Sequence, residues 1–222
     1  MPYRQTENVV RKLAARHAAI LTAARHAVVE GGMAAVQIAP VAARAGIATG
    51  TVYRYFPAKT DLVAELVKAL AAQEVAALGE AARAAPGPLS ALAAVFASFA
   101  MRSLAQRRLA YAVFAEPVEP DVEMARAAYR TAVAGEFQRL IGAALAGKHL
   151  PDQDAALTSA ALLGALTDGL IGPLAPATAD DPAKMRAQVQ ALTLLALRAL
   201  GIVDARARGL VVQTALALPS TS

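Results

Sequence analysis

The chain has 222 residues, of which 57% are hydrophobic, with no cysteine and a formal net charge of +5. The lack of cysteine excludes disulfide bonds and thiolate metal sites. The longest segment without a charge, residues 84–101, contains Pro86-Gly87-Pro88, so we expect no apolar membrane span of about 20 residues, and without a signal-peptide pattern we expect a cytoplasmic protein.

Positive charge is concentrated at the start of the chain. Residues 1–60 contain eight basic and two acidic residues, a net charge of +6, whereas the remainder has a net charge of −1. A basic segment on a neutral body is typical of proteins that bind a polyanion, with nucleic acid ahead of a membrane surface. A solvated basic face without a partner is the alternative.

The first predicted helix covers residues 11–30, where apolar residues recur every three or four positions. A short second helix is expected over residues 37–45, followed by Gly46, which suits a left-handed C-cap. Helix resumes at Thr49. Two short helices joined by a glycine-containing turn form a helix-turn-helix.

The third helix lies within the segment AGIATGTVYRYFPAKTDL, residues 45–62, which holds three of the chain's ten aromatic residues. Val52 and Phe56 are four positions apart and are expected to face the core. Glycine at position 50, in the first turn, destabilises the helix by about 1 kcal/mol relative to alanine. A glycine that allows another backbone to approach closely is therefore a better explanation than a glycine that is merely tolerated. For Tyr53 and Tyr55, core packing with the hydroxyls at the surface remains an alternative to phosphate contact.

The remaining residues predict a helical body. Helices are expected over residues 61–80, 89–106, 109–115, 121–148, 152–171 and 184–200, separated by breaks at residues 84–88 and 116–120. The tail from Gly201 is of uncertain order. Catalysis is not indicated, because His17, His26 and His149 lack metal-ligand spacing and no nucleotide or nucleophile motif is present. Asp168 is either a buried site or, more simply, an exposed break in a helix.

The last two predicted helices are apolar around most of their circumference. The core of one chain uses only a stripe of a helix, so these helices are expected to pack against a second chain. A fully buried pair in a monomer is the alternative. The predicted interface comprises Leu157, Ala161, Leu162, Leu166, Leu170, Leu192, Leu195 and Ala199.

Large side chains gather between the fifth and seventh predicted helices, among alanines too small to fill the gaps between long helices. They are either the lining of a ligand pocket or a completed core. A pocket of this kind predicts an apolar or weakly polar effector. The candidate lining residues are Phe96, Phe99, Met101, Tyr111, Phe114, Met124, Tyr129 and Phe137.

Residues 11–67 resemble the DNA-binding region of TetR-family transcriptional regulators. The resemblance rests on residues 45–62, on Ile20-Leu21-Thr22-Ala23-Ala24, on Gly31-Gly32 and on Val41-Ala42. Ala48 stands where the family usually has a capping serine, so Thr49 is a candidate for that cap. The resemblance implies that DNA is contacted by Gln37, which replaces a capping Ser or Thr, and by Thr49, Gly50, Thr51, Tyr53, Arg54, Tyr55 and the phosphate-binding Lys59.

The resemblance also implies an all-α, homodimeric repressor that binds palindromic operator DNA and is released by a small apolar effector, without cofactor or metal. The expected domains are a helix-turn-helix domain over residues 8–58, a helical effector-binding and dimerisation domain over residues 59–203, and a tail over residues 204–222. A signal would pass from the body to the DNA through the helix at residues 61–80. The competing hypothesis is a helical ligand carrier or protein-interaction module that retains the helix-turn-helix as scaffold.

Overall fold

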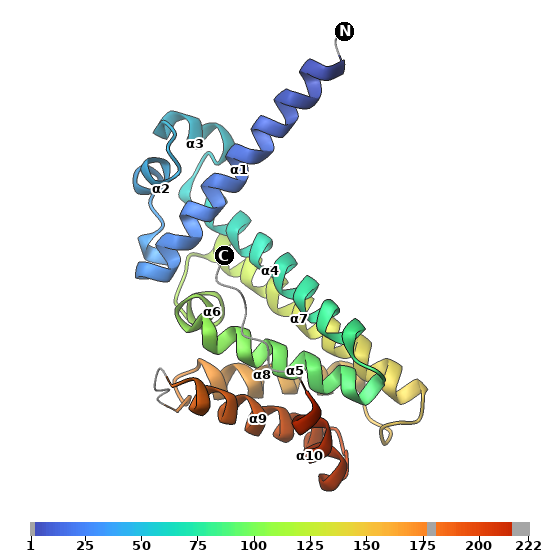
Figure 1. Ribbon diagram of the computed structural model, residues 1–222. Coiled ribbons are helices and arrows are strands. Elements are labelled where there is room, and N and C mark those ends of the chain that lie inside the picture. The colour runs from blue at the N-terminus through green and yellow to red at the C-terminus, as the bar shows by residue number, and fades with distance from the viewer. Residues whose placement is uncertain (1–2, 177–180, 215–222) are drawn as a thin grey trace.

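The computed structural model describes residues 3–176 and 181–214, and within these residues all regular structure is helical, which confirms the all-α prediction (Figure 1). The elements are α1 (Tyr3–Gly31), η1 (Met33–Ala35), α2 (Ile38–Arg44), α3 (Thr49–Tyr55), α4 (Lys59–Ala84), α5 (Pro88–Ala105), α6 (Arg107–Phe114), α7 (Pro120–Ala146), α8 (Ala155–Leu170), α9 (Pro182–Ala199) and α10 (Asp204–Gln213).

Helices α1, α2 and α3 form a small N-terminal unit, which we call the head. Ile20, Ala24 and Val28 on α1 are fully buried, and they pack with Val41 of α2 and Val52 of α3 in the core. Gly46 has the left-handed backbone conformation, with φ of 67°. Because only glycine adopts that conformation without strain, it ends α2 as predicted and turns the chain into α3.

The remaining helices form the body, in which α4 and α7 run side by side and α5 lies against both (Figure 1). Helices α8 and α9 lie at the end of the body away from the head. The body core is built around Phe137, whose ring meets those of Phe96 and Phe99 edge to face at centroid distances of 5.1 and 5.8 Å. Edge-to-face contacts of this kind add to the stabilisation that burial provides.

The largest differences from the predicted boundaries lie at the two ends of the chain. Helix α1 begins eight residues earlier than the apolar stripe indicated, and its first turns project beyond the head (Figure 1). The tail is helical from Asp204 to Gln213, with Ala207 and Val211 buried, while residues 215–222 lie outside the described residues. Helix α10 was missed because only these two buried positions mark its apolar side, which is too short a pattern to predict a helix.

Helix α5 is, within the described part of the chain, the one helix long and apolar enough to cross a membrane by length and composition. The prediction of no such span overlooked it because the helix starts after Pro86-Gly87 and continues past Arg102. Two-thirds of α5 is buried inside the protein. A central helix surrounded by α4, α7 and α9 accounts for this composition.

Candidate DNA interface and ligand pocket

Helix α3 has one buried face and one exposed face. Val52 is fully buried and Phe56, just after the helix, is nearly so, which holds α3 against α1 and α2. Four of the predicted contact residues are exposed on the other side: Thr49, Gly50, Tyr53 and Arg54. The exposed face therefore combines a hydroxyl, a phenol and a guanidinium around a glycine.

The capping expectations were wrong in detail. Gln37 is the N-cap residue of α2, yet its side chain makes no capping bond and donates from Nε2 to the carbonyl oxygen of Ala34 at 3.0 Å. The N-cap of α3 is Ala48, and no side chain caps that helix. Thr49 is therefore not used as a cap, and its hydroxyl is exposed on the first turn.

Tyr55, Thr51 and Lys59 are less free than their exposed neighbours. The Tyr55 hydroxyl donates to the carbonyl oxygen of Leu13 on α1 at 3.4 Å, and its ring lies 6.2 Å from that of His17, so packing against α1 accounts for this tyrosine. Thr51 is half-buried. Lys59 begins α4, and its Nζ lies 3.7 Å from Oε1 of Glu119.

Gly50 has no atom of the chain within 4 Å of the position that a Cβ would occupy, and its φ is not positive. Neither sterics nor backbone conformation within the chain requires a glycine there. We expect Gly50→Ala to raise the free energy of unfolding by about 0.5–1 kcal/mol, because alanine restricts the unfolded chain and favours helix. Urea unfolding checks the stability, and a binding assay on the same sample should show weaker DNA affinity. Unchanged DNA affinity would contradict a close backbone approach at Gly50.

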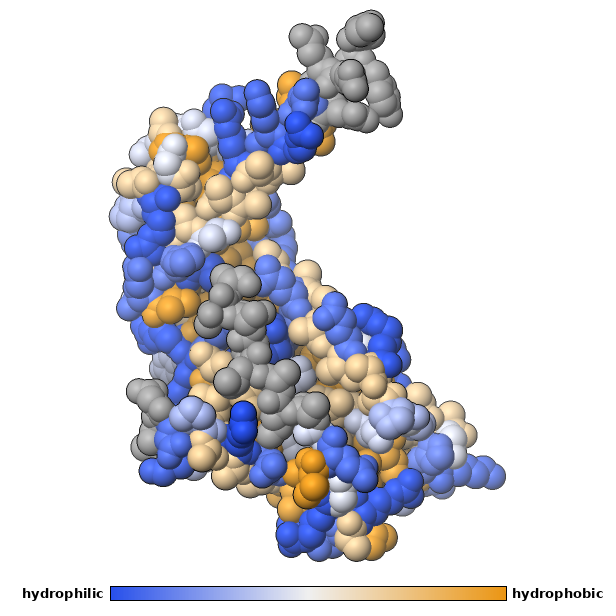
Figure 2. All heavy atoms as spheres, in the orientation of Figure 1, coloured by the Kyte–Doolittle hydropathy of each residue, from blue (hydrophilic) through white to orange (hydrophobic). Residues whose placement is uncertain are grey.

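Sequence reasoning missed a basic surface on the projecting part of α1. Arg11, Lys12 and Arg16 are exposed, and hydrophilic residues are prominent along this arm in Figure 2. Arg11 donates from Nη2 to Oδ1 of Asn8 at 2.6 Å. The arm projects on the side of the molecule that carries α3 (Figure 1). The signal was the net charge of +6 over residues 1–60, to which these residues contribute.

The residues predicted for the dimer interface divide into buried and exposed sets. Leu162, Leu166 and Leu170 are buried in the core of the single chain and are not available to a second chain, and Leu192 is half-buried. The exposed members form what we call the α8–α9 face, together with exposed small residues of the same helices. This face comprises Leu157, Ala160, Ala161, Gly164 and Ala165 of α8 and Ala187, Ala191, Leu195 and Ala199 of α9.

Asp168 is exposed on α8, which agrees with the simpler of its two interpretations, an exposed break in a helix.

Leu157 and Leu195 are 69% and 54% exposed, so large apolar side chains of the α8–α9 face are in contact with solvent on the single chain. Within the described residues no cluster of histidine and carboxylate side chains could hold a metal ion.

Most of the predicted pocket residues complete the core. Phe96, Phe99, Met101 and Phe137 are at most 2% exposed. Met124 is 69% exposed, and Tyr111 is half-buried beneath the guanidinium of Arg108. The core alternative is therefore right for these four, and the rings of Phe96 and Phe99 pack edge to face on that of Phe137. Phe114 and Tyr129 line a cavity.

That cavity lies where the head meets the body. Its volume is about 470 Å³ when the space open to solvent is counted. Half of its lining is polar, contrary to the apolar pocket predicted. The lining residues are Arg25 of α1; Leu70, Gln73 and Glu74 of α4; Arg102, Ser103 and Gln106 at the end of α5; Leu109, Ala110, Val113 and Phe114 of α6; and Tyr129 of α7.

A partly buried ion pair forms the polar side of the cavity. Oε2 of Glu74 accepts from Nε of Arg102 at 2.9 Å, and burial raises the pKa of the Glu74 carboxyl against the opposing effect of Arg102. Oε1 of Glu74 is buried without a hydrogen-bond partner. The sequence carried a signal for this residue, since Glu74 continues the spacing of the buried Leu66, Leu70 and Leu78 on α4.

Helix α6 and the loop after it form the joint between the head and the body. Arg25 donates from Nη2 to Oε1 of Gln106 at 2.7 Å, just before α6. Gly32, with φ of 78°, lies against the side chains of Arg108 and Glu116. Glu119 reaches Lys59 in the same region. Cavity, head and the start of α4 are therefore in contact through one short helix and its loop.

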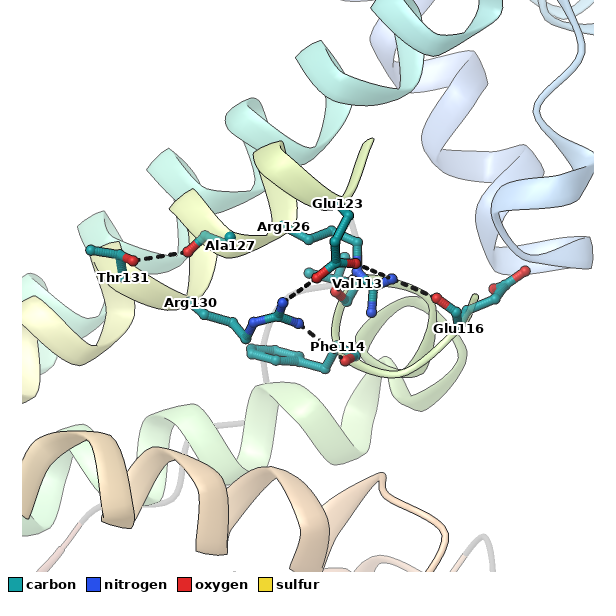
Figure 3. A network of polar contacts seen from close by, with 8 residues as sticks. All are labelled: Val113, Phe114, Glu116, Glu123, Arg126, Ala127, Arg130 and Thr131. Atoms are coloured by element: carbon teal, nitrogen blue, oxygen red, sulfur yellow. Dashed lines mark hydrogen bonds and ion pairs between the residues drawn. The ribbon is translucent and has the colours of Figure 1, made fainter. Parts of the chain in front are cut away.

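Polar contacts tie this joint to α7 (Figure 3). The Arg126 side chain is 4% exposed and donates from Nε to the carbonyl oxygen of Val113 at 2.6 Å and from Nη1 to that of Glu116 at 2.5 Å. Glu123 forms ion pairs with both Arg126 and Arg130. The end of α6 is thus held by charged hydrogen bonds from α7.

Comparison with known proteins gives matches to a family and to solved structures. The profile of the family described as bacterial regulatory proteins, tetR family, matches residues 20–66. A search of curated proteins finds no match. The structure of RolR without ligand is 20% identical, with a TM-score of 0.67 over 90% of this chain and 99% of that chain.

Two further structures show the same fold. FadR from Bacillus subtilis in complex with stearoyl-CoA is 17% identical, with a TM-score of 0.69 over 82% of this chain and 97% of that chain. RolR in complex with resorcinol is 21% identical, with a TM-score of 0.63 over 94% of this chain and 99% of that chain. These similarities extend over head and body alike, so the described part of the chain has the fold of these structures.

Proposed function

We propose that this chain, whose residues 20–66 match the tetR family of bacterial regulatory proteins, is a member of that family. It is a homodimeric, cytoplasmic repressor that a small molecule releases from operator DNA. The head is the DNA-binding domain, with its boundary at residues 58–59, where α4 begins. Residues 59–203 provide effector binding and dimerisation. Helix α10, within the tail, packs on α9 and α5 and extends this second domain.

The exposed face of α3 is the single observation that carries the proposal. Thr49, Tyr53 and Arg54 present a donor-rich surface around Gly50, and residues 1–60, which include the head, have a net charge of +6. A short helix with this composition fits the major groove, where arginine reads guanine and hydroxyls donate to phosphates. Lys59 and the basic arm of α1 add charge for the flanking phosphates.

The test is DNA binding as a function of salt and sequence. We expect the dimer to select a palindrome whose half-sites lie about 34–36 Å apart, with affinity falling steeply as salt rises. Arg54→Ala should weaken binding and relax base preference, whereas Lys59→Ala should weaken all sequences about equally. Selection from random duplexes followed by titration measures both. Absence of DNA binding at moderate salt would favour the ligand carrier or interaction module. If Arg54→Ala leaves the base preference unchanged, Arg54 does not contact the bases.

Dimerisation is supported by the α8–α9 face. Leucines exposed on one face among alanines and a glycine allow two helix pairs to approach closely and remove apolar surface from water. The position of this face at the far end of the body leaves both heads free. A palindromic site read by two heads requires that arrangement.

Effector control is supported by the position of the cavity. A ligand there would contact Arg25 of the head and Glu74 of α4, which also carries Lys59. A ligand that binds better in one head orientation shifts the population toward it. The solved structures of RolR with resorcinol and of FadR with stearoyl-CoA each hold a small molecule, and we propose that this chain also binds one.

A further inference from the structure

Glu74 occupies a position where packing alone would favour leucine. Leu66, Leu70 and Leu78 are buried on the same side of α4 at four-residue spacing, and Glu74 completes that series while being only 7% exposed. A buried carboxylate within an apolar stripe is costly, and such groups concentrate at functional sites. Its Oε2 is satisfied by Arg102, but Oε1 is buried without a hydrogen-bond partner in a residue that lines the cavity.

Tyr129 presents the complementary group in the same cavity. It is 6% exposed, its ring packs edge to face on Phe114 at 5.2 Å, and its hydroxyl makes no hydrogen bond to the described part of the chain. Burial, reinforced by the negative charge of Glu74, raises the pKa of the Tyr129 phenol well above its usual range, so the hydroxyl stays protonated and able to donate. The cavity thus contains an unused acceptor and an unused donor.

We propose, on the premise that this cavity is the effector site of the proposed function, that its ligand is a compact, uncharged aromatic alcohol of the phenol type. Its hydroxyl donates to Oε1 of Glu74 and accepts from the hydroxyl of Tyr129. A hydroxyl suits both groups because it is a donor and an acceptor at one atom.

Charge and size select the rest of the ligand. An ammonium group would meet the guanidiniums of Arg25 and Arg102 against one carboxylate, and a carboxylate would meet the free oxygen of Glu74. The cavity has a volume of about 470 Å³ when the space open to solvent is counted. Leu70, Leu109 and Val113 provide apolar walls against which an aromatic ring can pack.

The experiment measures binding of matched probes to the full-length protein by calorimetric titration and thermal shift. The probes are phenol, anisole, toluene, benzylammonium and benzoate. We expect phenol to bind at least ~10-fold more tightly than the other four, because a buried acceptor left unpaired penalises ligands without a donor. Anisole binding as tightly as phenol, or a charged probe binding best, would overturn the proposal. Absence of phenol binding would also overturn it and would assign the cavity to water.

Two variants test the pairing itself. Glu74→Leu restores the apolar stripe and leaves Arg102, which is 27% exposed, able to reach solvent; it should abolish the preference for phenol over toluene. If the leucine variant does not fold, Glu74→Gln serves in its place. It puts an amide at the same point and should reduce the preference for phenol over toluene. Tyr129→Phe should weaken phenol several-fold and leave toluene unchanged. A preference for phenol that survives both changes at Glu74 would refute the assignment.

Operator release is measured separately, so the two proposals fail independently. If phenol binds with the expected selectivity but leaves operator affinity unchanged, the ligand class stands and the repressor switch fails. If another small molecule releases the operator while phenol shows no selectivity, the switch stands and the ligand class fails.

Discussion

Replacing Leu195 with glutamate is expected to convert the dimer to monomers and to lower operator affinity by about 10²-fold or more. The Leu195 side chain is 54% exposed on the α8–α9 face, so a charge there leaves the core of the single chain intact and reaches water freely in the monomer. In the dimer the same carboxylate would be buried against apolar residues, which is strongly unfavourable. A single head then loses the effective concentration that its tethered partner provides.

Sedimentation and DNA titration of the same samples measure this prediction. Leu157→Glu, on the other helix of the face, should act in the same way, while Met124→Glu is the matched control because Met124 is 69% exposed on α7, outside the face. Circular dichroism should show unchanged helix content in all three variants. A Leu195→Glu protein that still sediments as a dimer would place the interface elsewhere.

The head could be predicted from the sequence nearly residue by residue because its signals are local. Gly46 is required by a positive φ, and Val52 and Phe56 are spaced as one buried face, so the helix-turn-helix follows from neighbouring residues alone. The errors concern side chains whose partners are distant in sequence. Tyr55 packs against Leu13, and Lys59 is paired with Glu119, contacts that no local pattern contains.

The body was predictable as helices but not as surfaces. Alanine-rich helices carry apolar residues on every side, so the sequence does not distinguish Leu162, which is buried, from Leu195, which is exposed. The same ambiguity assigned Phe96 and Phe137 to a pocket although they interlock in the core. Polar residues within apolar stripes are the sequence signals that could have located the cavity and the joint. Glu74 on α4 is one such residue, and Arg126 on α7 is another.

Replacing Arg126 with methionine is expected to lower the free energy of unfolding by about 3 kcal/mol. The side chain is 4% exposed, and its guanidinium satisfies the carbonyl oxygens of Val113 and Glu116 and pairs with Glu123 (Figure 3). Methionine has a similar length and no donor, so acceptors at the end of α6 lose charged hydrogen bonds and the desolvation cost of these groups is no longer offset.

Arg130→Met is the matched control, on the same helix and with the same partner carboxylate. Its side chain is 37% exposed, so water replaces the lost contacts to Glu123 and to the Phe114 carbonyl oxygen, and the expected loss is below about 1 kcal/mol. Urea unfolding at equal protein concentration measures both variants, because dimerisation makes stability depend on concentration. Equal losses in the two variants would show that burial of Arg126 does not set the strength of this joint. A much larger loss for Arg126→Met would show that one buried guanidinium holds α6, and with it the wall of the cavity, against α7.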